Sequence, residues 1–248
     1  MSKVKHLRKD EQQIEPLFNG AFTENKPIGF PNRSGTDAYS NLFYWAHLVA
    51  HETAEFPLHP HEGFEIMTFV LKGSVEHFDT VSKVYTPLNE GCVQAMQTGS
   101  GVSHSERITK GTELFQIWFD PDFSKSMPID AAYKDYTADS FVSKSNTNKE
   151  TLEYVGKDGL IKSITEGLEI KKTTFKSGMF DEVLDPAFTY SFYLLEGELV
   201  LDSDTLGKDD FYVLNNASSI TFEVNNGAEL FMIKTPTEIK YRRFIERY

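Results

Sequence analysis

Two short segments carry side chains that could bind a transition metal. His59 and His61 flank Pro60 in LHPHEGFE, while His104 and Glu106 lie two apart in GSGVSHSE. Side chains alternate between the faces of a β-strand, so each pair would project from one face of its strand. Pro60 donates no backbone hydrogen bond, which favours the start of a strand or the edge of a sheet. Together the HxH and HxE pairs predict a metal site.

Three imidazoles and one carboxylate would leave one or two positions open on a six-coordinate ion. We expect Fe(II) first, although Mn, Co, Ni, Cu and Zn accept similar ligands. Glu65 competes with Glu106 as the carboxylate ligand, because in an unbulged strand it shares the face of His59 and His61. Its alternative role is a hydrogen bond to a ligating imidazole. Spacing favours Glu106 as the ligand and leaves Glu65 open, and either carboxylate could accept a substrate proton.

The rest of the chain is typical of an all-β protein. Short runs rich in aromatic and β-branched residues, separated by Gly, Pro, Asn and Asp, predict a sandwich or barrel. Helical spacing is clearest at residues 237–248, where an apolar face predicts a short C-terminal helix. The apolar runs lie at residues 64–71, 115–119, 190–195 and 220–224.

An internal repeat indicates two domains. GTELFQIWFDP at 111–121 recurs 116 residues later as GAELFMIKTPT, and TFVLKGSVEHFD at 68–79 recurs 124 residues later as FYLLEGELVLDS. The second match aligns Gly73 with Gly197, and a duplicated barrel explains both. The polar segment 120–157 reads as a linker, so we expect domains at 1–135 and 136–248. All seven histidines precede residue 105, which assigns the histidine chemistry to the first domain.

Composition narrows the function further. The chain of 248 residues has a net charge of −12, which disfavours direct nucleic-acid binding. Cys92 is the single cysteine and fits a reducing compartment. The polar start MSKVKHLRKDEQQ lacks the apolar region of a signal peptide, and no apolar run is long enough to span a membrane. We therefore expect a cytoplasmic, monomeric protein.

At this point the motifs resemble those of the pirin family of bicupins. The similarity covers HPHEGFE, VQAMQTGSGVSHSE and ELFQIWF, closely over residues 56–121 and more loosely to residue 234. The resemblance implies two cupin barrels of jelly-roll type facing each other, with a degenerate, metal-free second barrel. It implies iron in the first barrel, bound by four ligands, and gives Glu65 a non-ligand role. The implied ligands are His59, His61, His104 and Glu106.

The second copy has no HxH pair. The offset of 124 instead places Val183 and Asp185 at those positions. The first copy also departs from the pirin pattern, because Glu62 stands where pirins commonly have arginine, and this puts the substrate and partner in doubt.

Two functions follow from the resemblance. The first is a quercetin 2,3-dioxygenase-like enzyme that acts on a small aromatic, flavonol-like substrate, with Glu106 or Glu65 as the proton acceptor. The second is a regulator that responds to metal or redox state by binding a transcriptional or metabolic protein partner. The sequence does not decide between enzyme and regulator.

Overall fold

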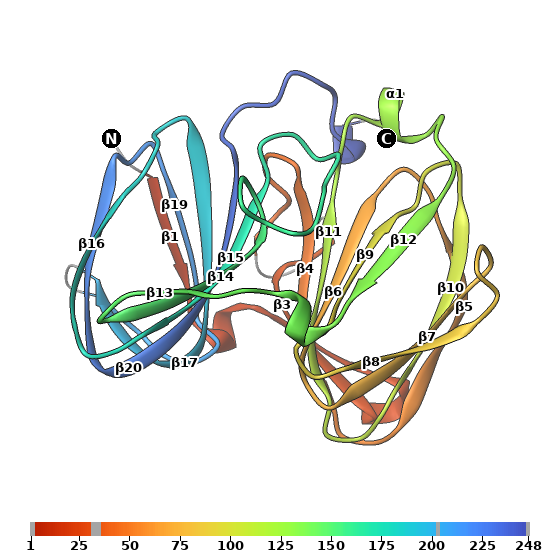
Figure 1. The fold of residues 1–248 in the computed structure, drawn as a ribbon, viewed down its shortest axis with the longest axis horizontal. Helices are drawn as coiled ribbons and strands as arrows, with labels where there is room; N and C mark the ends of the chain where they lie inside the picture. Colours follow the sequence, from red (N-terminus) through yellow and green to blue (C-terminus); the bar gives the residue numbers. More distant parts are fainter. Residues whose placement is uncertain (1–2, 31–35, 202–203, 247–248) are drawn as a thin grey trace. The chain divides into compact units, whose positions relative to one another are not determined.

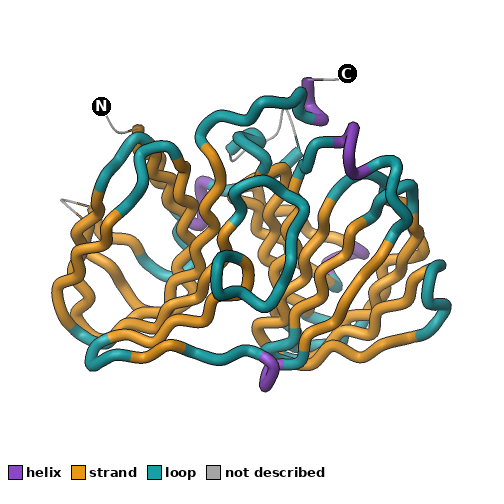
Figure 2. Tube along the Cα trace, turned by 45° about the horizontal axis from the view of Figure 1, so that its top comes forward, coloured by secondary structure: helices purple, strands orange, loops and turns teal. Residues whose placement is uncertain are grey.

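The computed structural model describes residues 3–30, 36–201 and 204–246, and nearly all of its regular structure is β (Figures 1 and 2). It comprises two compact units. The first unit along the chain is formed by Gln12–Ser140 with Tyr241–Tyr248, and the second by Phe141–Lys240 with Met1–Glu11. Each terminal segment therefore belongs to the unit formed by the other half of the chain. The expected division into 1–135 and 136–248 does not contain this exchange of terminal segments.

The N-terminal unit has one four-residue α-helix and eleven strands in two sheets. The seven-stranded sheet has the order β12-β9-β6-β11-β4-β3-β2, and the four-stranded sheet has the order β5-β10-β7-β8. Its elements are β2 Gln13–Leu17, β3 Phe22–Ile28, β4 Leu42–Ala50, β5 Ala54–His61, β6 Glu65–Lys72, β7 Ser74–Asp79, β8 Tyr85–Asn89, β9 Val93–Gln97, β10 Val102–Ile108, β11 Glu113–Phe119, α1 Phe123–Ser126, β12 Ala132–Tyr136, and 3-10 turns at Phe18–Gly20, Ala138–Ser140 and Phe244–Glu246.

Apolar side chains from both sheets meet in the core of this unit. Leu48 and Leu114 come from the seven-stranded sheet, and Val75, Leu88 and Ile108 come from the four-stranded sheet. All five are buried. Alternation along each strand supplies one apolar face per sheet, which is the condition for packing two sheets face to face.

The C-terminal unit is built on one nine-stranded sheet. Its main path runs β1-β19-β17-β20-β15-β14-β13, with β16 paired to β20 and β18 to β17. Its elements are β1 Lys3–Leu7, a 3-10 turn at Lys9–Glu11, β13 Lys144–Ser145, β14 Lys149–Val155, β15 Glu169–Phe175, β16 Gly178–Val183, β17 Phe188–Leu201, β18 Asp204–Leu206, β19 Phe211–Asn215 and β20 Ser219–Pro236.

The all-β fold class is confirmed, with two corrections of detail. The units are open jelly-roll sheets rather than closed barrels, because the pairing leaves edge strands such as β5 and β12. The helix expected over 237–248 is a single 3-10 turn at Phe244–Glu246, and residues 247 and 248 lie outside the described part of the chain. Much of the expected linker is also folded, since β12 and β14 both lie within 120–157. Among the described residues, no helix is long and apolar enough to cross a membrane.

The strand register repeats in the two units, as the internal repeat predicts. In the first, Lys72 pairs with Glu113 and the register then shifts so that Val70 pairs with Leu114. In the second, Glu196 pairs with Glu229 and the same shift brings Leu194 opposite Leu230. Both pairings, with the bulge between them, follow the offsets of 124 and 116. These two strand pairs therefore have the same pairing at the level of single residues.

The glycine that follows each bulge is also equivalent. A Cβ on Gly73 would lie 2.8 Å from Thr112 Cα, and a Cβ on Gly197 would lie 2.8 Å from Ala228 Cα. Both glycines have positive φ, +79° and +86°. The repeated glycine therefore marks a place where the neighbouring strand leaves no room for a side chain.

We expect Gly197→Ala to lower the free energy of unfolding by roughly 3 kcal/mol, as strain at positive φ adds to overlap with the neighbouring strand. Gly227→Ala is the matched control, because φ there is +91° and the nearest atom to a new Cβ, Phe175 O, lies at 3.4 Å. It should cost about 1 kcal/mol. Urea denaturation compares the two variants. Equal losses would show that crowding at Gly197 contributes nothing.

Candidate metal centre

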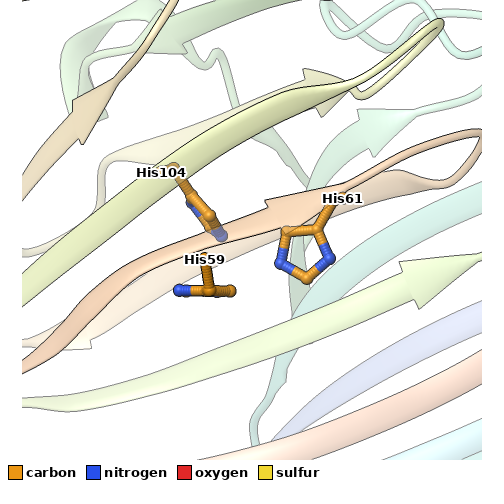
Figure 3. A group of neighbouring side chains, drawn as sticks. All are labelled: His59, His61 and His104. Atoms are coloured by element: carbon orange, nitrogen blue, oxygen red, sulfur yellow. The ribbon is translucent and has the colours of Figure 1, made fainter.

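Three of the predicted ligands converge between the sheets of the N-terminal unit. His59 and His61 project from β5, and His104 projects from the neighbouring strand β10 (Figure 3). Their ring centroids lie 4.8 Å (His59–His61), 4.4 Å (His59–His104) and 4.9 Å (His61–His104) apart. One nitrogen from each ring falls within 4.8 Å of the others, so the three form a potential metal-binding group.

The register of β5 and β10 explains this convergence. His104 pairs with His59, and Glu106 pairs with Phe56. Between these two pairs, β10 advances by two residues and β5 by three, so β5 contains a β-bulge. The extra residue keeps the side chains of Phe56 and His59 on the same face of β5. Pro60 is tolerated because β5 is an edge strand of its sheet.

Burial favours the neutral form of His61 and of His104. Burial, with the charges of the neighbouring rings, lowers the pKa of His61 and of His104 to about 3 in each case. Neutral imidazole is the form that binds metal. The Nε2 atoms of His61 and His104 are buried without a hydrogen-bond partner among the described residues. Buried polar atoms are rarely left unpaired, so two such nitrogens that face each other's rings fit a metal ion.

Hydrogen bonds at the other ring nitrogens fix how the imidazoles face the centre. His59 Nδ1 donates to Pro57 O at 2.8 Å, which leaves Nε2 with its lone pair. His104 Nδ1 lies 3.2 Å from His77 Nε2. For His104 to offer Nε2 to a metal, its Nδ1 must carry the proton and donate it to His77. His77 is fully buried.

Glu106 lies beside the three histidines but outside the group that they form. Both of its carboxylate oxygens accept hydrogen bonds from Gln116 Nε2, at 3.0 and 3.1 Å. Burial raises the pKa of Glu106, and the neighbouring His77 and His59 rings oppose this rise. Its role as the fourth ligand stays a prediction.

Gln116 and Trp118 on β11 link Glu106 back to the histidines, and sequence reasoning missed the role of Gln116. Gln116 Oε1 accepts a hydrogen bond from Trp118 Nε1 at 3.3 Å. The Trp118 ring meets His61 edge to face, with centroids 4.7 Å apart. The signal available in the sequence was the i, i+2 spacing of these two residues in ELFQIWF, which places both on one face of the strand.

Glu65 does not share a strand with the HxH pair. β5 ends at His61, Gly63 has φ of +79°, and Glu65 begins β6 in the other sheet. The assumption of one unbulged strand was therefore wrong. Glu65 is buried, and Gln97 Nε2 lies 3.5 Å from its Oε1. A catalytic role for Glu65 stays a prediction that the spacing no longer supports.

A hollow of about 580 Å³ lies at the surface beside His61. It is bounded by the ends of β5 and β10 and by Thr80 in the turn after β7, and His61 lies in its wall. Glu62, which stands where pirins commonly have arginine, lies in the same wall. Its volume is in the range of small-molecule sites, and of the three imidazoles only that of His61 is among the described residues that line it.

We expect His77→Leu to weaken metal binding by roughly 10- to 100-fold, because His104 would lose the partner that orients its ring. Competition with a chromogenic chelator measures the affinity. His47→Leu serves as the control, since His47 on β4 is also a buried histidine of this unit but packs against Phe115 of β11. Unchanged affinity in a folded His77→Leu protein would contradict the orienting role.

Comparison with known proteins agrees with this geometry. The model of the Pirin family matches residues 31–119, which contain all four predicted ligands. Residues 31–119 belong to the pirin family. A quercetin 2,3-dioxygenase of Escherichia coli strain K12 is 44% identical over 71 residues, covering 27% of this chain and 30% of that protein. A pirin-like protein of Caulobacter vibrioides is 40% identical over 68 residues, covering 27% and 29%.

The pirin likeness extends to the whole fold. The crystal structure of a bacterial pirin from Escherichia coli in complex with nickel(II) matches with a TM-score of 0.79 and 20% identity. The match covers 95% of this chain and 100% of that one. At this level of identity the match shows the fold, and it covers both units rather than the pirin domain alone.

Proposed function

We propose that the pirin domain binds one divalent metal ion through His59, His61, His104 and Glu106, with Fe(II) as the first candidate. The observation that carries this proposal is the pair of buried Nε2 atoms of His61 and His104, which have no hydrogen-bond partner among the described residues. They lie beside His59, whose Nδ1 donates to Pro57 O. Three imidazole nitrogens directed at one place suit a first-row transition metal. Glu106 would complete the set by leaving Gln116, and the negative carboxylate would offset part of the ion's charge.

We further propose that this centre catalyses a dioxygenase reaction on a flavonol such as quercetin. A bound metal ion would supply Lewis acidity and hold vicinal hydroxyl and carbonyl oxygens of the substrate. Glu106 would accept the substrate's hydroxyl proton, because burial raises its pKa above the usual value of a carboxyl group. The names of relatives such as the Escherichia coli quercetin 2,3-dioxygenase support this substrate class.

The protein's own side chains would orient such a substrate. The hollow beside His61 would receive part of the substrate. Trp118 lies against His61 and offers an aromatic edge, and Gln116 can donate to whichever carboxylate oxygen remains free. These contacts position the ring and hold the accepted proton away from water.

Oxygen consumption tests the activity directly. Iron-loaded protein supplied with quercetin should consume about one O₂ per quercetin, as a dioxygenase does, whereas metal-free protein and His61→Ala should consume none above background. Metal binding without oxygen consumption across a panel of flavonols would contradict the enzyme proposal. It would favour the alternative, a cytoplasmic metal- or redox-responsive regulator, in which case recovery of a protein partner should differ between the Fe(II) and Fe(III) forms.

A further inference from the structure

The C-terminal unit contains a cavity of about 330 Å³ on the inner face of its sheet. The volume falls in the range of small-molecule sites. Met232 on β20 lines it and is partly exposed, whereas its neighbours Phe231 and Ile233, which point to the opposite face, are fully buried. Side chains therefore do not fill the space at the cavity face, whereas they would fill the interior of a purely structural barrel.

This cavity is the counterpart of the metal centre in the other unit. Glu106 pairs with His77, and in the second copy Phe222 pairs with Leu201, at offsets of 116 and 124. The next pair along repeats in the same way, with Ile108 opposite Val75 and Val224 opposite Leu199. β20 therefore takes the place of β10, and β17 takes the place of β7.

The strand that corresponds to β5 is β16, and it shows what replaces the histidines. Ile220 pairs with Glu182 as His104 pairs with His59. The next inward position on β5, His61, corresponds to Leu184, whose N–H donates to Ser218 O at 2.9 Å. The metal-ligand positions His59, His61, His104 and Glu106 thus correspond to Glu182, Leu184, Ile220 and Phe222, all of which line the cavity.

These replacements remove metal binding from the second copy. Three of the four positions are apolar, and the fourth, Glu182, is paired with Lys149. Within residues 141–201 and 204–240, no three His, Cys, Asp or Glu side chains lie close enough together to hold an ion. Apolar surface in the place of ligands instead suits the body of an organic molecule.

The other end of the cavity is strongly polar but carries no net charge. Lys171 Nζ lies 3.0 Å from Glu169 and 3.5 Å from Glu153, and Lys234 Nζ lies 2.6 Å from Glu169. Burial favours the neutral form of Lys171, but Glu169 and Glu153 outweigh it and raise the pKa of this lysine. The three lysines of the lining are thus balanced by three glutamates.

Such a lining selects a particular kind of polar group. A hydroxyl can donate to a carboxylate and accept from an ammonium group at the same time, whereas a carboxylate or an amine would face a like charge beside its partner. Thr151 and Thr173, whose hydroxyls lie 3.1 Å apart between the polar and apolar ends, add further hydroxyl partners. An adjoining apolar hollow shares Phe192, Ile220 and Phe222 with the cavity and extends its apolar end.

We propose that the cavity of the C-terminal unit binds an uncharged aromatic molecule that bears a hydroxyl group, without a metal ion. The aromatic body contacts Phe222, Ile220 and Leu184, and the hydroxyl lies between Glu169 and Lys171. This site is separate from the metal centre and does not depend on the function proposed for it.

Calorimetric titration of chelator-treated, metal-free protein with 2-naphthol tests the proposal. We expect one binding site per chain in wild type and an unchanged site in His61→Ala. Thr173→Trp fills the cavity and should abolish binding. Thr174→Trp makes the same change at the adjacent residue of β15, which is exposed on the other face, and should leave binding intact. Thr151→Phe fills the cavity from β14 and replaces Thr173→Trp if that variant does not fold.

The polar group of the ligand is tested with 2-naphthoate, which has the same rings and a negative charge. It should bind about 10-fold more weakly than 2-naphthol, and Glu169→Gln should weaken 2-naphthol binding by a similar factor. Three results would overturn the proposal: no 2-naphthol binding to wild type, binding that persists when the cavity is filled, or tighter binding of 2-naphthoate. Loss of binding in His61→Ala alone would place the ligand at the other site and overturn it as well.

Discussion

Replacement of His61 by alanine should reduce the metal content of the protein from about one ion per chain to near zero. His61 supplies one of three converging nitrogens, and even side chains that only orient a ligand contribute 10- to 100-fold to affinity, so loss of a ligand should cost more than ~100-fold. Elemental analysis of protein purified without chelators measures the ratio.

The control for this variant is His51→Ala. His51 is an exposed histidine of the same unit, and its Nε2 lies 2.8 Å from Thr23 Oγ1. It should retain the full metal content. The metal-free His61→Ala protein should also remain folded, because the deleted Nε2 makes no hydrogen bond. Equal metal content in wild type and a folded His61→Ala protein would place the metal elsewhere.

The largest loss of stability is expected for Phe64→Ala, at roughly 3–5 kcal/mol. Phe64 is buried and connects the turn after β5 with α1 and the C-terminal tail, so its removal would leave a cavity that rigid neighbours cannot fill. Guanidinium denaturation followed by tryptophan fluorescence reports on this unit, because both tryptophans belong to it. The rings around Phe64 are Phe43 at 4.9 Å, Phe244 at 5.0 Å, Phe123 at 5.1 Å and Trp118 at 5.7 Å.

Phe30→Ala makes the same deletion near the same cluster. Because Phe30 is 38% exposed, this variant should lose less than half as much free energy of unfolding. Phe64→Ala should also weaken metal binding, since Phe64 supports Trp118, which packs against His61. A loss for Phe64→Ala no greater than that for Phe30→Ala would show that the aromatic cluster is not the rigid support of the centre.

Much of the metal centre could be predicted because its determinants are local. The i, i+2 spacings of His59 with His61 and of His104 with Glu106 fix which side chains share a face, whatever the tertiary structure. The distances between strands follow once β5 and β10 pair. His77 and Gln116 could not be found in this way, because their hydrogen bonds to His104 and Glu106 cross between strands that are distant in sequence.

The β-bulge in β5 limited the use of the repeat. The offset of 124 holds for Phe56, which corresponds to Phe180, since these residues pair with Glu106 and Phe222. Beyond the bulge the offset falls to 123, so His59 corresponds to Glu182. The positions Val183 and Asp185 expected from the sequence were therefore wrong by one residue. A bulge adds one residue without a sequence signal strong enough to locate it.

The terminal segments show where pattern reasoning failed. β1, KVKHL, has no run of apolar residues that would mark a strand in the sequence. It nevertheless pairs with β19, and His6 Nε2 lies 3.1 Å from Asp210 Oδ2. The tail has helical spacing, but each of its aromatic residues makes a separate contact with the body of the unit. Tyr241 Oη donates to Asp120 O at 2.7 Å, and Phe244 packs against Phe64. Docking by separated aromatic residues can produce the same spacing as an amphipathic helix.

X-ray absorption at the iron edge of Fe(II)-loaded protein tests most directly whether three imidazoles of the pirin domain hold a metal ion. We predict a first shell of nitrogen and oxygen atoms with outer-shell scattering from three imidazole rings, reduced to two rings in any residual iron of His104→Ala. A spectrum of wild type with one imidazole or none, or one unchanged by His104→Ala, would contradict this prediction.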